Sequence, residues 1–283
     1  MSNGAARFQF DTAKISPPCP RTSSDKRPQP EHLYKPTNAK ERRSQMKVLA
    51  INGSPNMDRG NTALILNPFL DGMREAGAIV EVFYTRRLTV NPCLGEFNCW
   101  LKTPGQCFQQ DDMAWLLPKI AEADIQVLAT PLYVDGLTGP LKNLLDRTIP
   151  LNEPQIEMRR GHCRHPGRPG VKSGRLVLVA SCGFWEMDNF NPLLVHIKAV
   201  CKNAGMQYAG ALLRPHGPAL KPMMEMGLPV ADIFRAAHKA GRQLIAEGKI
   251  AAGLLKTIGR ELLPRDMYVE QANEFFRKAL KNR

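Results

Sequence analysis

The segment that decides the fold is Val48-Leu49-Ala50-Ile51-Asn52-Gly53-Ser54-Pro55-Asn56-Met57-Asp58-Arg59-Gly60-Asn61-Thr62. An apolar run of strand length comes first, and a helical pattern begins near residue 61, after the loop. The first N–H groups of a helix have no partner within the helix and attract anions, while glycine lets a ligand approach the backbone closely. The segment therefore predicts a strand, a phosphate-binding loop and a helix.

Strand and helix patterns alternate along the rest of the chain. Strands are expected at 47–52, 79–84, 124–130, 175–182 and 207–213, and helices near 61–76, 111–122, 138–147, 189–204, 228–248 and 266–281. This alternation predicts a doubly wound α/β fold with five parallel strands and helices on both faces. Such sheets bind ligands beyond the carboxyl ends of their strands. The loops after the first, third and fourth strands therefore define the expected site.

The two later loops carry aromatic side chains. They read Thr130-Pro131-Leu132-Tyr133-Val134-Asp135-Gly136 and Ser181-Cys182-Gly183-Phe184-Trp185. Proline and glycine favour an extended loop whose amides can bond the edge of a planar ring, and the aromatic side chains provide flat surfaces. A phosphate loop beside two such loops predicts a mononucleotide site. Trp185 and Trp100 are candidate substrate contacts, and each either covers the substrate face or is buried.

Composition limits the class of protein. Of the 283 residues 43% are hydrophobic, which is enough for a sizeable core, and no apolar run is long enough for a membrane span or secretory signal. We therefore expect a cytoplasmic protein with no membrane partner. Residues 1–45 hold nine Lys and Arg against four Asp and Glu and predict a disordered basic tail, followed by a domain at 46–250 and a helical extension at 251–283.

Five motifs in order resemble those of the flavodoxin-like NAD(P)H-dependent FMN reductase family and its iron–sulfur flavoprotein relatives. They are Gly53-Ser54-Pro55 with Gly60-Asn61-Thr62, Asp111-Asp112-Met113, Ala129-Thr130-Pro131-Leu132-Tyr133, Gly139-Pro140-Leu141-Lys142-Asn143-Leu144-Leu145-Asp146-Arg147, and Cys182-Gly183-Phe184. The resemblance covers about residues 46–215. It implies bound FMN, the strand order 2-1-3-4-5 and a homodimer.

The resemblance also implies roles for individual residues. Ser54, Gly60, Asn61 and Thr62 would hold the FMN phosphate. Pro131, Leu132, Tyr133 and Val134 would border the isoalloxazine ring, and Gly183 and Phe184 would contact its other edge.

Three cysteines follow the second strand, where the family has its cysteine cluster. They are Cys93, Cys99 and Cys107, with Glu96 where the compact family pattern has a cysteine. An iron–sulfur cluster needs four ligands, so three thiols and a carboxylate disfavour both a cluster and any other metal site. The thiols are expected to pack as small hydrophobic groups; a zinc site is the other reading, although the paired spacing of zinc ribbons is missing.

The net charge of +13 raises the question of an anionic partner. Part of it lies in the tail and part in Arg159, Arg160, Arg164 and Arg168, in a loop rich in glycine and proline. No basic helix or aromatic ladder accompanies them, so nucleic acid is disfavoured. The loop either covers the phosphates of a dinucleotide, with Arg164 as a candidate substrate contact, or is a solvated basic loop.

These observations predict an FMN-dependent oxidoreductase. It would pass hydride from NADH or NADPH through bound FMN to a small acceptor such as a flavin, quinone, azo or nitro compound. The flavin carries the chemistry, so no catalytic side chain is assigned. The alternative is a flavodoxin-like electron carrier or a redox-responsive FMN-binding protein that does not turn over NAD(P)H.

Overall fold

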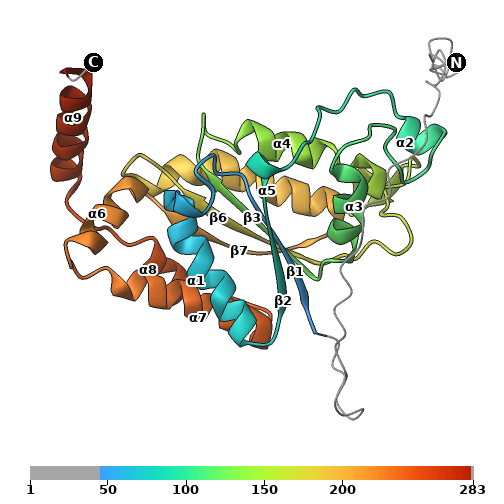
Figure 1. The fold of residues 1–283 in the computed structure, drawn as a ribbon. Helices are drawn as coiled ribbons and strands as arrows, with labels where there is room; N and C mark the ends of the chain where they lie inside the picture. The colour runs from blue at the N-terminus through green and yellow to red at the C-terminus, as the bar shows by residue number, and fades with distance from the viewer. Residues whose placement is uncertain (1–44, 282–283) are drawn as a thin grey trace, which may run out of the picture. The chain divides into compact units, whose positions relative to one another are not determined.

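Five parallel strands form the central sheet of the computed structural model, which describes residues 45–281. The strands are β1 (Lys47–Asn52), β2 (Ile79–Tyr84), β3 (Ile125–Pro131), β6 (Arg175–Ser181) and β7 (Gln207–Arg214). Their order across the sheet is β2-β1-β3-β6-β7 (Figure 1). In chain order this is 2-1-3-4-5, so the predicted flavodoxin-like fold is confirmed.

Helices cover both faces of the sheet (Figure 1). The helices are α1 (Asn61–Glu75), α2 (Asn98–Leu101), α3 (Met113–Glu122), α4 (Gly139–Asp146), α5 (Asn191–Ala204), α6 (Leu220–Glu225), α7 (Ala231–Glu247), α8 (Ala252–Ile258) and α9 (Arg265–Lys281). Alternate side chains of β1 enter opposite cores: Val48 and Ala50 pack with α1 and α7, whereas Leu49 and Ile51 pack with α3, α4 and α5. A strand has a period of two, so one apolar run supplies both cores.

Short elements connect the larger ones. A small antiparallel hairpin consists of β4 (Glu157–Arg159) and β5 (His162–Arg164), inside the loop that carries the arginine cluster. This hairpin, α2, α6 and α8 were not predicted, because three to seven residues give too short a periodic signal. The expected tail lies outside the described residues except for Gln45. The domain boundaries stay predictions, although α8 packs against α7 and β7.

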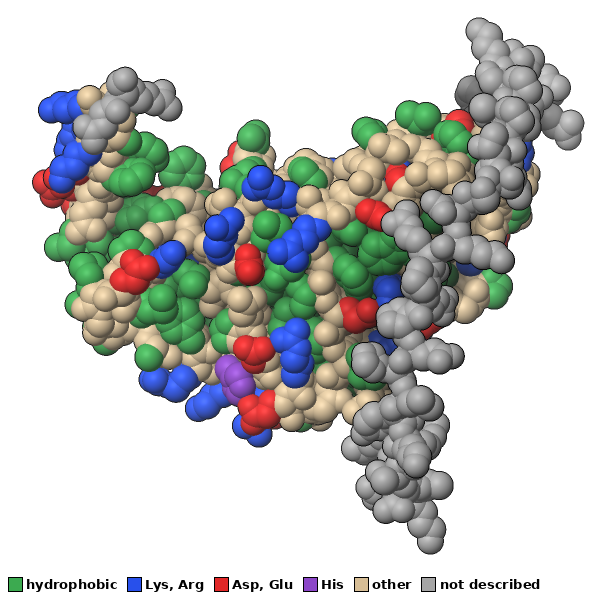
Figure 2. All heavy atoms as spheres, in the orientation of Figure 1, with side chains coloured by type: hydrophobic (Ala, Val, Ile, Leu, Met, Phe, Trp, Pro, Cys, Tyr) green, Lys and Arg blue, Asp and Glu red, His purple; other side chains and the backbone are tan. Residues whose placement is uncertain are grey.

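Charged side chains of both signs are mixed on the surface. On the face drawn in Figure 2, Lys and Arg side chains are interspersed with Asp and Glu instead of forming one continuous basic surface. No helix within residues 45–281 is both long and apolar enough to cross a bilayer.

Two glycines let α1 and α7 touch through their backbones. A Cβ on Gly72 would lie 1.9 Å from the carbonyl oxygen of His238, and a Cβ on Gly241 would lie 1.9 Å from that of Phe69. Glycine normally weakens a helix interior, so its presence at both sides of the crossing is explained by this close packing.

The close packing of α1 against α7 predicts that one methyl group added at Gly241 lowers the stability of the fold strongly. Gly241→Ala should force the two backbones apart and lower the free energy of unfolding by about 3 kcal/mol or more, measured by urea denaturation. Gly253→Ala, in α8 with open space around its Cβ position, is the matched control and should change stability by less than about 1 kcal/mol. Equal stabilities of the two variants would contradict the packing described here.

Candidate functional site

Hydrogen bonds join the three loops that follow β1, β3 and β6. The Gly53 carbonyl accepts a bond from Thr138 Oγ1 at 2.9 Å, and the Leu132 N–H donates to the Ser181 carbonyl at 2.7 Å. The hydroxyl oxygens of Thr62 and Ser181 are 2.8 Å apart. The structure therefore brings the three predicted loops together at the carboxyl edge of the sheet, a position known for ligand sites in this kind of fold.

The first loop forms a cradle at the start of α1. No side chain within the described residues caps this helix. Ser54 and Thr62 are almost completely buried, with 3% and 1% of their surface exposed, and a Cβ on Gly60 would lie only 2.7 Å from Ser54 Oγ. An uncapped helix start with two inward hydroxyl groups and a glycine where a side chain would fill the space suits an anion. Asn61 is the first residue of the helix and is partly exposed.

The second loop contains a strained turn. Tyr133 and Gly136 exchange backbone hydrogen bonds of 3.2 and 3.1 Å, and the two residues between them, Val134 and Asp135, have positive φ angles of 46° and 59°. A β-branched residue in this conformation is costly. Val134 is fully exposed and Tyr133 is half exposed, so neither side chain fills the sheet edge.

The third loop exposes one aromatic ring and anchors another. Phe184 is 68% exposed, whereas the Trp185 indole N–H donates to the Leu263 carbonyl at 3.0 Å. Gly183 offers its carbonyl oxygen to the Tyr268 hydroxyl. Trp185 is thus a partly buried anchor to the C-terminal segment, a role that the sequence left open.

Two other predicted substrate contacts lie in a different part of the structure. The Trp100 indole N–H donates to the Ile149 carbonyl at 3.2 Å, and its ring stacks on Phe97 and packs at a tilt against His165. Arg164 lines an open cavity between α4, α5 and the hairpin. Neither of these contacts involves the three loops at the carboxyl edge.

The arginines of the hairpin loop make mostly internal contacts. Arg159 donates to the Asn203 carbonyl at 2.8 Å, and Arg168 pairs with Glu153 at 3.0 Å. Arg160 stands at the turn of the hairpin with a φ angle of 53°. The expected cover for dinucleotide phosphates stays a prediction, and the guanidinium groups of Arg159, Arg164 and Arg168 already donate hydrogen bonds within the chain.

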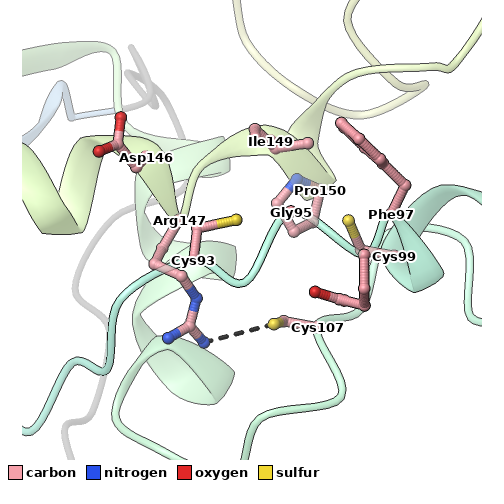
Figure 3. Close-up of a pocket in the computed structure, with 10 residues that line it drawn as sticks. Cys93, Gly95, Phe97, Cys99, Cys107, Asp146, Arg147, Ile149 and Pro150 are labelled. Atoms are coloured by element: carbon pink, nitrogen blue, oxygen red, sulfur yellow. Dashed lines mark hydrogen bonds between the residues drawn. The ribbon is translucent and has the colours of Figure 1, made fainter. Parts of the chain in front are cut away.

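The three cysteines that follow β2 line one small pocket (Figure 3). Its volume is about 10 Å³, near the space of one water molecule. Burial raises the pKa of the Cys99 thiol above its ordinary value, and the neighbouring Cys107 and Glu96 add to this shift. Within residues 45–281, no group of three or more His, Cys, Asp or Glu side chains is placed to hold a metal ion.

A buried ion pair supports that pocket. Arg147 donates to both carboxylate oxygens of Asp111, at 2.6 and 3.0 Å, and to the Asn91 carbonyl at 2.7 Å. Its remaining contact is with Cys107 Sγ at 3.4 Å, drawn as a dashed line in Figure 3. Burial alone would raise the pKa of Asp111, but the bonds from Arg147 and the backbone outweigh it and lower that pKa below its ordinary value.

The carboxyl edge also has a cavity that sequence reasoning missed. It has a volume of about 460 Å³ and lies between the loop after β2 and the start of α4. Its lining comprises Thr85, Leu88, Val90, Gly139, Pro140, Asn143 and Leu144. In the sequence, nothing distinguishes these lining residues from ordinary loop residues, so the cavity was not predicted. Ser181 and Thr138 were also missed as links between the loops, because their partners lie more than 80 positions away.

The sheet order defines a flavodoxin-like fold, with a glycine-containing loop at the start of α1 that suits an anion. The family model described as NADPH-dependent FMN reductase matches residues 46–188, half of the chain, so the chain belongs to that family. This confirms the resemblance read from the five motifs.

Curated relatives include two archaeal iron–sulfur flavoproteins. That of Archaeoglobus fulgidus is 40% identical over 103 residues, 36% of this chain and 49% of the relative. That of Methanocaldococcus jannaschii is 39% identical over 106 residues, 38% of this chain and 53% of the relative. The chain thus spans about half the length of the relatives it matches.

Solved structures agree with the fold. An FMN-dependent NADH-azoreductase from Bacillus anthracis, solved with FMN, has a TM-score of 0.55 at 16% identity, covering 71% of this chain and 100% of that chain. An NAD(P)H:quinone oxidoreductase from Methanothermobacter marburgensis has a TM-score of 0.50 at 18% identity, covering 71% and 98%. At these identities the likeness shows the fold alone.

The buried ion pair between Asp111 and Arg147 predicts that the stability of the fold depends strongly on the Asp111 carboxylate. Asp111→Ala leaves the Arg147 charge buried without its partner and should lower the free energy of unfolding by about 3–5 kcal/mol in urea titrations. Asp146→Ala, which removes the exposed partner of Lys142, is the control and should change stability by less than about 1 kcal/mol. Because the pKa of Asp111 is lowered in the folded state, its contribution is complete above about pH 4 and is lost as the pH falls further. Equal urea midpoints for both variants would contradict this role.

Proposed function

We propose that this protein is an FMN-dependent oxidoreductase that takes hydride from NADH or NADPH and passes the electrons to a small organic acceptor. The observation that carries the proposal is the meeting of the three loops at the carboxyl edge of the sheet, where Gly60 faces the buried Ser54 hydroxyl inside the span matched by the FMN reductase family. A helix start with a glycine and buried hydroxyl groups beside it suits the phosphate of a mononucleotide.

Two groups of residues at the carboxyl edge would contact different parts of FMN. Ser54, Gly60, Asn61 and Thr62 would hold the phosphate through backbone N–H groups and hydroxyls. Residues 131–134, with Gly183 and Phe184, would border the ring. The half-exposed Tyr133 and the exposed Phe184 offer flat apolar surfaces to a planar ligand.

Bound FMN would supply the hydride-accepting and electron-donating chemistry. The chain's own part is then to orient the ring and to leave one face open for nicotinamide and acceptor in turn. An open, aromatic edge does not select strongly among planar molecules, which supports flavins, quinones, azo or nitro compounds as the acceptor class.

The thiol pocket does not fit the cluster named in the relatives. Cys93, Cys99 and Cys107 provide three thiols where a cluster needs four ligands, and the pocket beside them has room for about one water. We therefore propose that FMN is the redox group of this chain and that its electrons do not pass through an iron–sulfur cluster.

A homodimer is the assembly that we propose, following the family resemblance. In support, α9 buries none of its side chains, and Val269, Phe275, Phe276 and Leu280 on it are 47–66% exposed. An amphipathic helix of this length gains most of its stability from packing, so a covered apolar face is expected in the assembled protein.

Reduction by nicotinamide separates the reductase from a carrier. The purified protein should be yellow and should lose its visible flavin absorption when NADH or NADPH is added without oxygen. Yellow protein that responds only to dithionite would establish the carrier instead. Colourless protein that cannot be reconstituted with FMN would refute both readings.

Removing two hydroxyl groups should release the cofactor. Ser54→Ala combined with Thr62→Val deletes two neutral hydrogen-bond donors to phosphate and should weaken FMN binding by about ten- to a hundredfold, measured by equilibrium dialysis. Thr62→Ser keeps the hydroxyl and should retain FMN. Ser173→Ala with Thr257→Val makes the same chemical changes at an exposed and a partly exposed position outside the three loops and is the control. Unchanged FMN content in the first double variant would refute the phosphate assignment.

A further inference from the structure

Three successive residues of loop 182–185 are held by residues that lie beyond the family-matched span. The Tyr268 hydroxyl donates to the Gly183 carbonyl, the His216 backbone N–H donates to the Phe184 carbonyl at 2.6 Å, and Trp185 donates to the Leu263 carbonyl at 3.0 Å. Loop 182–185 is therefore fixed from the C-terminal part of the chain, although it follows β6.

His216 lies at the centre of these contacts and is fully buried. Its ring packs beside Trp185, with centroids 5.9 Å apart, and meets the edge of Tyr268 at 5.7 Å. Its φ angle of 40° lies in the left-handed region, which a histidine adopts only at a cost. Surrounding contacts must hold it there.

The protonation of His216 follows from its partners. Nε2 receives the Leu262 backbone N–H at 3.0 Å and faces Arg214 Nη2 at 3.3 Å, and both can only donate. The ring is therefore neutral with its proton on Nδ1. Burial, and then the nearby charge of Arg214, lower the pKa of His216 to about 4, in agreement with this assignment. Nδ1 is buried and has no partner within residues 45–281.

The segment that provides these contacts is itself rigidly attached. Arg214, fully buried at the end of β7, donates to the Ile258 carbonyl at 2.7 Å and to the Arg260 carbonyl. Arg260 in turn forms a two-pronged ion pair with Asp232 at the start of α7, at 2.7 and 2.9 Å. Residues 258–268 are thus tied to the sheet and to α7, so they can fix a loop in position.

From this network we infer that residues 258–268 belong to the ring-edge side of the flavin site, with Tyr268 and His216 as positioning residues for loop 182–185. The inference rests on the proposed function for the identity of the ligand. The Tyr268 hydroxyl donates to the carbonyl of Gly183, the residue before the exposed Phe184. Tyr268 lies in the first turn of α9, a helix that buries none of its side chains completely. Burial, with the neighbouring Cys182, raises the pKa of Tyr268 above its ordinary value, so its hydroxyl remains a donor.

The test uses single substitutions in the full-length protein. Tyr268→Phe frees the Gly183 carbonyl and should raise the FMN dissociation constant about five- to tenfold, the effect of losing one hydrogen bond. It should also change the visible circular dichroism of bound FMN, which reports how the ring is held. Tyr208→Phe, at the start of β7 and so at the opposite end of the strand from His216, is the matched control and should change neither. His216→Asn, which tolerates the left-handed backbone, should act in the same direction as Tyr268→Phe.

A second measurement does not depend on FMN. Amide hydrogen exchange of residues 182–186 in flavin-free protein should become faster in Tyr268→Phe than in Tyr208→Phe. Faster exchange with an unchanged FMN dissociation constant and dichroism would overturn the inference while leaving the proposed function intact. Unchanged exchange would overturn the anchoring itself. Failure of the unaltered protein to bind FMN would refute the proposed function and this assignment to a flavin site, and the exchange data would still report on the anchoring.

Discussion

Parallel pairing of β1, β3 and β6 in one register is the constraint on which the site depends. Asn52 lies opposite Ala129, and Pro131 lies opposite Ser181, so the three strands end at nearly the same level. Each strand is buried on both faces, and a one-residue slip would exchange the side chains that enter the two cores. The cores therefore fix the register, and the register places the loop after β1 and the two aromatic loops side by side.

Several departures from local rules lie near this edge. The start of α1 lacks a side-chain cap, Val134 has a left-handed backbone, and His216 combines a left-handed backbone with a buried nitrogen that has no partner in the described chain. Each of these features costs stability. Groups that bind a ligand cannot also satisfy one another, so such features suit a binding site.

The sequence predicted those features that short-range patterns determine. Alternation of apolar strands and amphipathic helices predicted the five strands and the long helices, the family resemblance implied the sheet order, and Gly60 with Thr62 marked the loop at the start of α1. Contacts between distant residues were not predictable in this way. Asp111 and Arg147 are 36 positions apart, and Gly183 and Tyr268 are 85 apart, with no periodic signal that links them. For the same reason the residues from 215 onward, which show no recognisable motif, gave no sign of their contacts with loop 182–185.

The backbone contact between α1 and α7 affects how this protein can be dissected. The family-matched span ends at residue 188, whereas α7 begins at Ala231 and supplies much of the apolar cover for one face of the sheet. A fragment that comprises residues 46–188 would also lack β7. The buried strand β6 would then become an exposed edge of the sheet. Such a fragment would aggregate, so the span that the family model matches is shorter than the length of chain that folds.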